Sequence, residues 1–162
     1  MQFKLDVVLD RSLIMKVTIQ SNKLQKKLSK LDDTVSNLDK DLYKLASQTI
    51  IDIQERTYNS KDVNNRTFIP YTPSYRKRKR KAGYPSKPTL SWSNNMLNAM
   101  RKKVIKGGFE IYFGDAYEKK KAYYINYGIG KQPKRKFFGL SKKGSTTIVN
   151  KLKKIVGSVI NE

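Results

Sequence analysis

The spacing of apolar positions predicts one long amphipathic helix over residues 21–58. Apolar side chains recur there at alternating steps of four and three residues, which places them on one face of a helix. Ser21 and Asn22 suit the N-cap, and a break is expected near Asp32-Asp33-Thr34, because Asp and Thr inside a helix compete for backbone groups. The stripe consists of Leu24, Leu28, Leu31, Val35, Leu38, Leu42 and Leu45, and Ile50, Ile51 and Ile53 continue it.

A helix of this length is not stable on its own. Ordering each backbone residue costs about 1–2 kcal/mol, and burying each large apolar side chain returns about 1.5–3 kcal/mol, so a single stripe does not offset the whole cost. The stripe must therefore be covered by a sheet of the same chain or by a second copy of the helix. The heptad spacing leaves a coiled-coil partner open, although packing within the same domain is the commoner case.

Two pairs of short strands are predicted. Apolar and polar residues alternate between residues 2 and 9, and after a turn at Asp10-Arg11 a second apolar run extends to residue 20. Further along, Val104-Ile105 and residues 109–113 flank Lys106-Gly107-Gly108, which is typical of a tight hairpin.

Three further helices complete the prediction. Ser93-Asn94-Asn95 suits the start of a short helix over residues 96–100, and residues 116–127 form a helix that Gly128 closes. Ser145 is expected to cap a C-terminal helix that packs beside the long one. The predicted fold class is α+β: one domain over residues 1–162, with the long and C-terminal helices packed on a small antiparallel sheet. Residues 1–20 are expected to be an N-terminal hairpin extension.

Two segments lack any regular pattern and are predicted to be extended arms, over residues 59–88 and 129–144. Both are rich in Pro or Gly and neither has a face that it can bury by itself. The first contains Phe68, Tyr71 and Tyr75 and the second contains Phe137 and Phe138, so we expect these aromatic side chains to be buried on neighbouring subunits. The first also carries an unbroken basic run, Arg76-Lys77-Arg78-Lys79-Arg80-Lys81, which is typical of a solvated, phosphate-seeking patch.

Net charge narrows the range of partners. The chain carries a formal charge of +22, and the excess is uneven. Residues 1–64 hold 11 Lys and Arg against 9 Asp and Glu, whereas residues 65–162 hold 24 against 4. A Lys-rich proteome explains a general excess of Lys but not this asymmetry. We therefore expect polyanionic or acidic partners.

The residue inventory argues against an enzyme. The chain has no Cys and no His, which excludes thiolate chemistry, imidazole bases and the common zinc sites. Asp52, Glu55 and Asp62 lie near one another but match no spacing known for a metal site or an acid–base pair. We expect no cofactor and no metal. Without a long apolar run or a signal peptide, we also expect no membrane partner and synthesis in a cytoplasm.

Four motifs in a fixed order resemble the virion-morphogenesis, or tail-completion, family of long-tailed bacteriophages. They are Phe68-Ile-Pro-Tyr-Thr-Pro-Ser-Tyr75 with the basic run after it, Thr89-Leu-Ser-Trp-Ser-Asn-Asn-Met-Leu97, the segment from Tyr123 to Gly128, and Pro133-Lys-Arg-Lys-Phe-Phe-Gly-Leu-Ser141. The resemblance covers roughly residues 24–157, and only the last block is specific. Asn94 stands where the family usually has Gly, and Asn tolerates the positive φ that such a turn needs.

The resemblance implies a head–tail joining protein of the virion. Members form rings, commonly of six copies, at the top of the tail, where they meet connector and tail-terminator or tail-tube proteins. Synthesis is then in the cytoplasm of the host bacterium. The expected subunit or partner interface consists of Phe68, Pro70, Tyr71, Tyr75, Pro133, Arg135, Phe137 and Phe138. The basic run Arg76–Lys81 is expected to contact either the passing DNA, without sequence preference, or an acidic partner protein. Protein docking is favoured, because the prolines around the run stiffen it.

A second class of function stays open. A strongly basic region with interleaved tyrosines is typical of proteins that bind nucleic acid without sequence preference. Against this alternative stands the lack of any recognised nucleic-acid-binding fold. The two hypotheses differ in assembly, since the first requires a ring and the second is satisfied by a monomer.

Overall fold

A four-stranded antiparallel sheet forms the base of the molecule. In this computed structural model, which describes residues 4–20 and 32–160, the strand order is β1-β2-β4-β3. The strands are β1 (Lys4–Leu9), β2 (Met15–Gln20), β3 (Met100–Ile105) and β4 (Gly108–Phe113). Both predicted hairpins are confirmed, and pairing of β2 with β4 joins them into one sheet.

A close approach between the two hairpins requires a glycine at the start of β4. A Cβ atom added at Gly108 would lie 2.0 Å from the backbone oxygen of Val17, which belongs to β2. Thr18 pairs with Gly108 and Val17 with Phe109 in this register. The glycine of the predicted hairpin turn therefore also sets the contact with the neighbouring strand.

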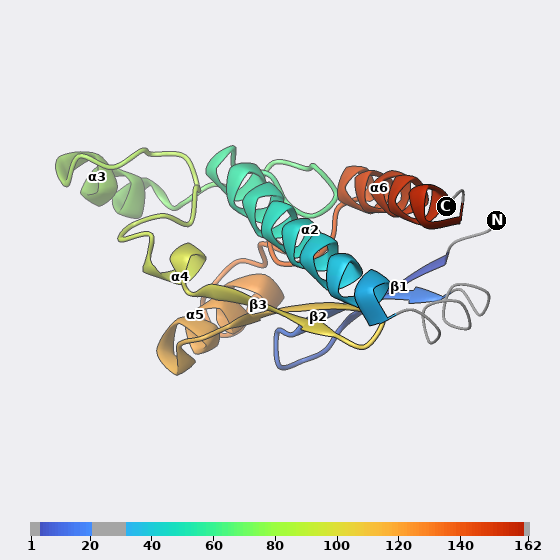
Figure 1. The fold of residues 1–162 in the computed structure, drawn as a ribbon. Helices are drawn as coiled ribbons and strands as arrows, with labels where there is room; N and C mark the ends of the chain where they lie inside the picture. Colours follow the sequence, from blue (N-terminus) through green and yellow to red (C-terminus); the bar gives the residue numbers. More distant parts are fainter. Residues whose placement is uncertain (1–3, 21–31, 161–162) are drawn as a thin grey trace.

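Helix α2 (Asp32–Tyr58) runs across the sheet and contacts β3 and β4, and α6 (Lys142–Ile160) packs beside it near β1, as Figure 1 shows. Most of the apolar stripe whose side chains the structure describes faces the core: Leu38, Leu42, Leu45 and Ile53 are buried. Ile51 is 50% exposed, so the prediction that it continues the stripe is wrong. The predicted helix over residues 21–31, with its caps and the first part of the stripe, lies outside the described residues. The fold class predicted from the sequence, α+β with two helices on a small antiparallel sheet, is confirmed.

The shorter helices lie at the end of the sheet where β3 begins and β4 ends (Figure 1). Helix α5 (Ala116–Tyr127) begins after Asp115, whose side chain caps it, and ends at Gly128, which has a φ of 71°. Helix α4 (Asn95–Asn98) contacts α5 and is shorter than predicted, because Met100 already belongs to β3. Asn94, which precedes α4, has the predicted positive φ, at 61°.

The cap of α6 corrects one prediction. The helix begins at Lys142 rather than after Ser145, because the side chain of Ser141 accepts a hydrogen bond from the backbone N–H of Gly144 at 2.9 Å. A serine three residues before a free backbone N–H satisfies the usual geometry of an N-cap. Over the residues that the structure describes, no helix combines the length and the apolar character that crossing a bilayer requires.

The arm predicted as extended over residues 59–88 contains a helix, α3 (Pro73–Lys81). Thr72 caps it and Pro73 occupies its first turn, a position that favours proline. Lys and Arg are good helix formers, so the basic run continues the helix once a cap starts it. The prediction that this stretch is extended throughout is therefore wrong.

The two arms are not free of the body either. The backbone N–H of Val63 donates to the backbone oxygen of Lys136 at 2.9 Å, which ties one arm to the other. Phe68 is 4% exposed, and Phe137 and Phe138 are both 0% exposed, within a single chain. The expectation that these three side chains are buried on neighbouring subunits is therefore wrong, because they complete the chain's own core.

Candidate functional site

Helix α3 projects at one end of the molecule, away from the sheet (Figure 1). Its charged residues are all positive, and five of the six are exposed. Among the described residues no carboxylate forms an ion pair with this helix. The outer surface of α3 is therefore an uncompensated cationic ridge, which consists of Arg76, Lys77, Arg78, Arg80 and Lys81.

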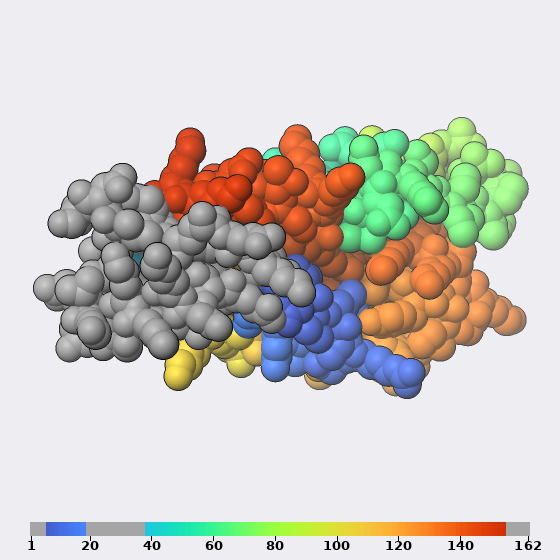
Figure 2. Space-filling view, turned by 90° about the vertical axis from the view of Figure 1, so that its right-hand side faces the viewer, coloured from blue at the N-terminus to red at the C-terminus, as the bar shows by residue number. Residues whose placement is uncertain are grey.

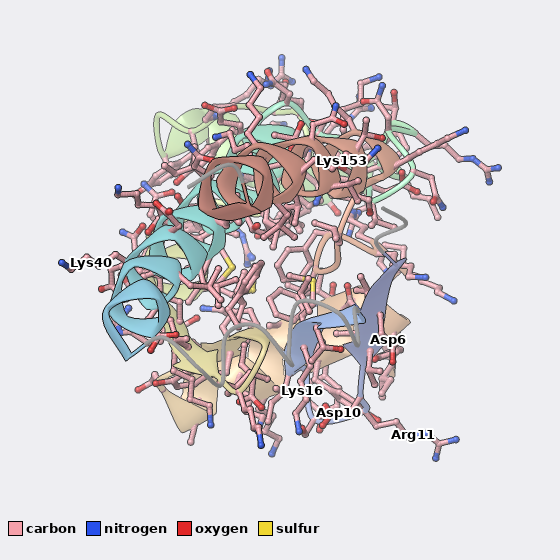
Figure 3. All side chains as sticks on the ribbon, turned by 45° about the vertical axis from the view of Figure 1, so that its right-hand side comes forward. Asp6, Asp10, Arg11, Lys16, Lys40 and Lys153 are labelled. Carbon is pink, nitrogen blue, oxygen red and sulfur yellow. The ribbon has the colours of Figure 1, made fainter. Side chains whose placement is uncertain are left out.

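The β1–β2 hairpin differs from α3 in charge. At the β1–β2 hairpin, Figure 3 shows Asp6 and Asp10 close to Arg11 and Lys16, so charges of both signs are mixed there. The Asp10 carboxylate accepts hydrogen bonds from the side chain and backbone of Ser12, and these bonds hold its pKa below the usual value. The mixed charges of this hairpin therefore contrast with α3, whose charged residues are all positive.

Aromatic rings fasten the cationic helix to the body. The guanidinium carbon of Arg78 lies 4.9 Å from the ring centre of Tyr75 and 5.5 Å from that of Trp92. The rings of Tyr75 and Trp92 are themselves 5.9 Å apart, and those of Tyr84 and Trp92 are 5.2 Å apart. Cations above aromatic rings are stabilised by the negative ring faces, which explains how a run of like charges remains packed.

Lys79 is the exception in the basic run, since it is only 1% exposed. Its ammonium lies 5.1 Å from the ring centre of Tyr71 and 6.0 Å from that of Tyr84, and no carboxylate of the described residues pairs with it. Burial lowers the pKa of Lys79, because water no longer solvates the charged form.

Arg135 supplies a second buried cation, at 3% exposure. Its Nε and Nη2 atoms donate to the backbone oxygen of Ile69 at 3.0 and 2.8 Å, and Nη2 also lies 3.4 Å from the backbone oxygen of Pro70. The guanidinium stands 4.9 Å from the ring centre of Tyr71, and burial lowers the pKa of Arg135. Arg135 therefore links the two predicted arms within one chain, rather than linking two subunits.

A pocket of about 440 Å³ opens beneath α3. Figure 2 shows residues of the first arm, in green, lying beside the orange residues of the α5 region. Its apolar lining includes Pro70, Tyr71, Tyr75, Leu90, Trp92, Met96, Tyr124, Ile125 and Pro133, and its charged lining is Lys79, Lys121, Lys131 and Arg135. We call this the arm pocket. Every charged residue that lines it, among those that the structure describes, is positive.

The structure thus divides the sequence-predicted site residues into two groups. Pro70, Tyr71, Tyr75, Pro133 and Arg135 come together around the arm pocket, whereas Phe68, Phe137 and Phe138 lie in the core. Sequence reasoning missed Trp92, Tyr124, Lys121 and Lys131 as neighbours of the basic run. Trp92 carries one usable signal, because it is the single Trp of the chain and stands in an irregular stretch.

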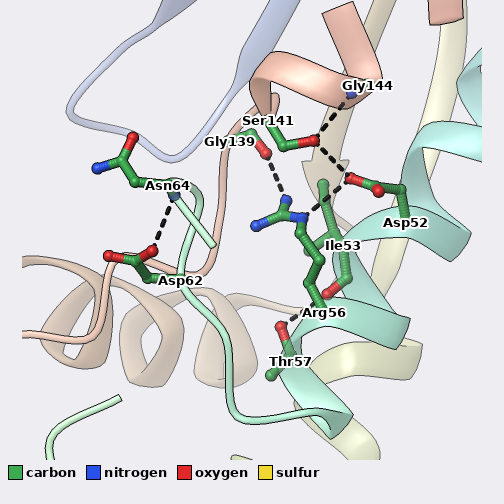
Figure 4. Close-up of polar contacts among 9 residues, drawn as sticks. All are labelled: Asp52, Ile53, Arg56, Thr57, Asp62, Asn64, Gly139, Ser141 and Gly144. Carbon is green, nitrogen blue, oxygen red and sulfur yellow. Dashed lines mark hydrogen bonds and ion pairs between the residues drawn. The ribbon is translucent and has the colours of Figure 1, made fainter. Parts of the chain in front are cut away.

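Two of the three acids considered for catalysis, Asp52 and Asp62, have structural partners (Figure 4), whereas Glu55 is exposed. The Asp52 carboxylate accepts from Arg56 Nε at 3.0 Å and lies 3.3 Å from Ser141 Oγ, while Arg56 Nη2 donates to the backbone oxygen of Gly139 at 2.9 Å. This cluster holds the last motif against α2. The Asp62 carboxylate accepts from two backbone N–H groups of its own loop. Within the described ranges, no group of three acids, His or Cys is arranged to hold a metal.

The comparisons with known proteins leave the family open. No protein-family model matches the chain, and no curated protein or solved structure is significantly similar to it. What the chain binds must therefore be inferred from the cationic ridge and the arm pocket.

Proposed function

We propose that this chain is a structural subunit of a bacteriophage neck or tail, which forms a ring with its own copies, completes the tail and joins it to the head connector. The cationic ridge of α3 is the observation that carries this proposal. It projects from a compact α+β body and presents positive charge that the described residues of the chain do not neutralise. Such a surface requires an acidic partner.

Two further features support the proposal. A long helix on an antiparallel sheet agrees with the fold that the resemblance to tail-completion proteins implies. Two of the three acids that a catalytic hypothesis would use, Asp52 and Asp62, accept hydrogen bonds that hold loops together, which fits a structural role. Docking on an acidic ring-shaped protein assembly is favoured over contact with DNA. Aromatic side chains and prolines hold α3 as a rigid projection, whereas contact with DNA suits a mobile cationic tail.

The alternative function is sequence-independent binding of nucleic acid by a free, non-enzymatic protein. The charge of +22 and the exposed Lys and Arg residues of α3 favour it, since phosphate contacts of this kind need no specific geometry. The two functions can be distinguished in the virion, because only the first requires the chain for joining heads to tails.

An add-back experiment tests the proposal. Heads and tails are purified from infected cells that lack this chain, the purified protein is added, and infectious particles are counted. A ridge variant replaces four exposed cations of α3 by Gln, namely Arg76, Lys77, Arg80 and Lys81. It keeps Arg78 and Lys79, which contact aromatic side chains. A control variant replaces four exposed lysines elsewhere by Gln, namely Lys40, Lys142, Lys153 and Lys154.

Wild-type protein and the control variant should restore infectious particles, and the ridge variant should not. Both variants lose the same charge, so a difference between them assigns the effect to α3. Infectious particles that form equally well without any added chain would overturn the proposed function. If, in addition, only the ridge variant fails to bind duplex DNA, the nucleic-acid-binding alternative holds.

A further inference from the structure

We propose that the arm pocket is a receptor for an acidic peptide segment of a partner protein, in which a carboxylate side chain lies next to an aromatic or large apolar one. This inference goes beyond the proposed function, because it concerns a concave site behind the cationic ridge, and it does not require a ring. Its ligand is defined by the charges and surfaces that line the pocket.

The first support is an imbalance of charge in a buried place. Lys79 and Arg135 are 1% and 3% exposed, and among the described residues neither has a carboxylate partner. Burying a cation without a counter-charge is costly, and a ligand carboxylate that reaches both groups relieves that cost. Lys121 is already paired with Glu118 at 2.5 Å, so it contributes less net charge.

The guanidinium of Arg135 is also held in an orientation that leaves donors available. Its hydrogen bonds to Ile69 and Pro70 use Nε and Nη2, so Nη1 takes no part in them. An arginine held in place by backbone oxygens loses little conformational freedom when it binds a carboxylate. The exposed Lys131 lies on the rim of the same pocket, where it adds a third positive charge without an ion-pair partner in the described part of the chain.

The second support is the shape and surface of the pocket. Its volume of about 440 Å³ lies within the range of about 300–1,000 Å³ that ligand pockets occupy. Leu90, Trp92, Met96 and Ile125 give it an apolar side, on which an aromatic or aliphatic side chain of the ligand has surface to cover. An acidic residue next to an apolar one matches both parts of the lining.

Nucleic acid fits the same pocket less well. Bases bind by stacking on ring faces, but cations already lie over the rings: Lys79 and Arg135 over Tyr71, and Arg78 over Tyr75 and Trp92. A duplex presents its phosphates to projecting side chains, whereas Lys79 and Arg135 lie inside a pocket that a single side chain of a ligand enters. The cationic ridge, rather than the pocket, offers the surface that a duplex needs.

Trp92 provides a specific reporter for the test. It is the single Trp of the chain, it is 38% exposed, and it lines the pocket. Its fluorescence is recorded while the full chain is titrated with the dipeptide N-acetyl-Phe-Asp-amide. A matched titration uses N-acetyl-Phe-Asn-amide, which differs only in lacking the charge. Inorganic phosphate and an eight-residue oligothymidylate serve as competing probes.

The Asp dipeptide should give a saturable change in Trp92 fluorescence and bind about tenfold or more tightly than the Asn dipeptide, as expected for charge-assisted hydrogen bonds. Lys131→Gln and Lys79→Met should each reduce that preference at least threefold. The control Lys134→Gln should leave it unchanged, because Lys134 is exposed in the same loop but does not line the pocket. The emission spectrum without ligand checks that each variant keeps the native surroundings of Trp92.

Equal binding of the two dipeptides, or no saturable signal from either, would overturn the inference. So would a preference that both Lys131→Gln and Lys79→Met leave unchanged. If the oligothymidylate or phosphate displaces the Asp dipeptide and binds more tightly than it does, the pocket is a phosphate site and the proposal is wrong. None of these outcomes depends on ring formation, so they are separate from the add-back experiment.

Discussion

Phe138→Ala tests whether the aromatic residues near the C-terminus belong to the core of a single chain. The Phe138 side chain is 0% exposed, and its ring centre lies 5.1 Å from that of Phe113 and 6.3 Å from that of Phe137. Its backbone N–H donates to Asn126 Oδ1 at 3.1 Å. This residue of the second arm therefore packs against β4 and lies next to α5, and shortening it leaves a cavity that these elements cannot close without moving.

The cost of this cavity is large relative to total stability. Replacing a fully buried Phe by Ala lowers the free energy of unfolding by about 3–5 kcal/mol, and a domain of this kind has about 5–15 kcal/mol in all. For a chain of this length, each kcal/mol corresponds to about 2–4 °C in Tm. Phe138→Ala should therefore lower Tm by about 6–20 °C, measured by circular dichroism and by Trp92 fluorescence.

The control is Tyr117→Ala, since Tyr117 is 73% exposed. Its Tm should change by no more than about 4 °C, because the one cation contact of its exposed ring, with Lys121, contributes about 0.5–1 kcal/mol. If Phe138→Ala instead melts like the wild type and prevents assembly, Phe138 is an interface residue and the single-chain core described above is wrong.

Three further changes have expected outcomes. The hydrogen bond from Lys103 holds the pKa of the Glu110 carboxyl in the folded chain below its ordinary value of 4.5. The ionised Glu110 therefore adds its full contribution to stability above pH 4.5, and this contribution is lost as the pH falls through the folded-state pKa. Urea unfolding of wild type and Glu110→Gln should therefore differ most above pH 5 and converge in acid; a constant difference would contradict the ion pair. Gly128→Ala should cost at least about 1–2 kcal/mol, because Gly128 has a φ of 71° and an added Cβ would lie 2.8 Å from Lys134 Cα; an unchanged Tm would refute this backbone geometry. In DNA titrations at several salt concentrations, the logarithm of the binding constant is plotted against the logarithm of the salt concentration. Replacing each exposed cation of α3 by Gln should flatten this slope by up to about 0.9, whereas Lys79→Gln should leave it unchanged, because Lys79 is buried. Equal effects at all six positions would show that Lys79 reaches phosphate.

Local patterns in the sequence were sufficient to predict most of the regular structure. The second hairpin follows from alternating residues around Lys106-Gly107-Gly108, because only a tight turn suits two adjacent glycines between such runs. Helix α5 has a capping Asp115 in front and Gly128 behind, and its observed bounds match the prediction. Caps and turns act over a few residues, so they are visible without knowledge of the fold.

The arm pocket was not predictable in the same way, because its parts come from three separate stretches of the chain. No feature of a run of six cations distinguishes Lys79, which is buried, from its exposed neighbours. Its burial depends on Tyr71 and Tyr84, which meet it only after α3 has formed. Similarly, the irregular pattern around Phe137 and Phe138 gave no sign that backbone hydrogen bonds to α5 and to the first arm would place both rings in the core.

The mass of the purified protein, measured by native mass spectrometry at increasing ammonium acetate concentration, tests most directly whether the chain is a ring subunit. Copies at +22 repel one another at low salt, and at about 1 M salt the screening length falls to about 3 Å, so that repulsion between exposed charges is largely removed. A ring subunit should then give one closed oligomer of fixed copy number, with six as the expected value. A mass that stays that of a monomer at every salt and protein concentration would contradict the ring.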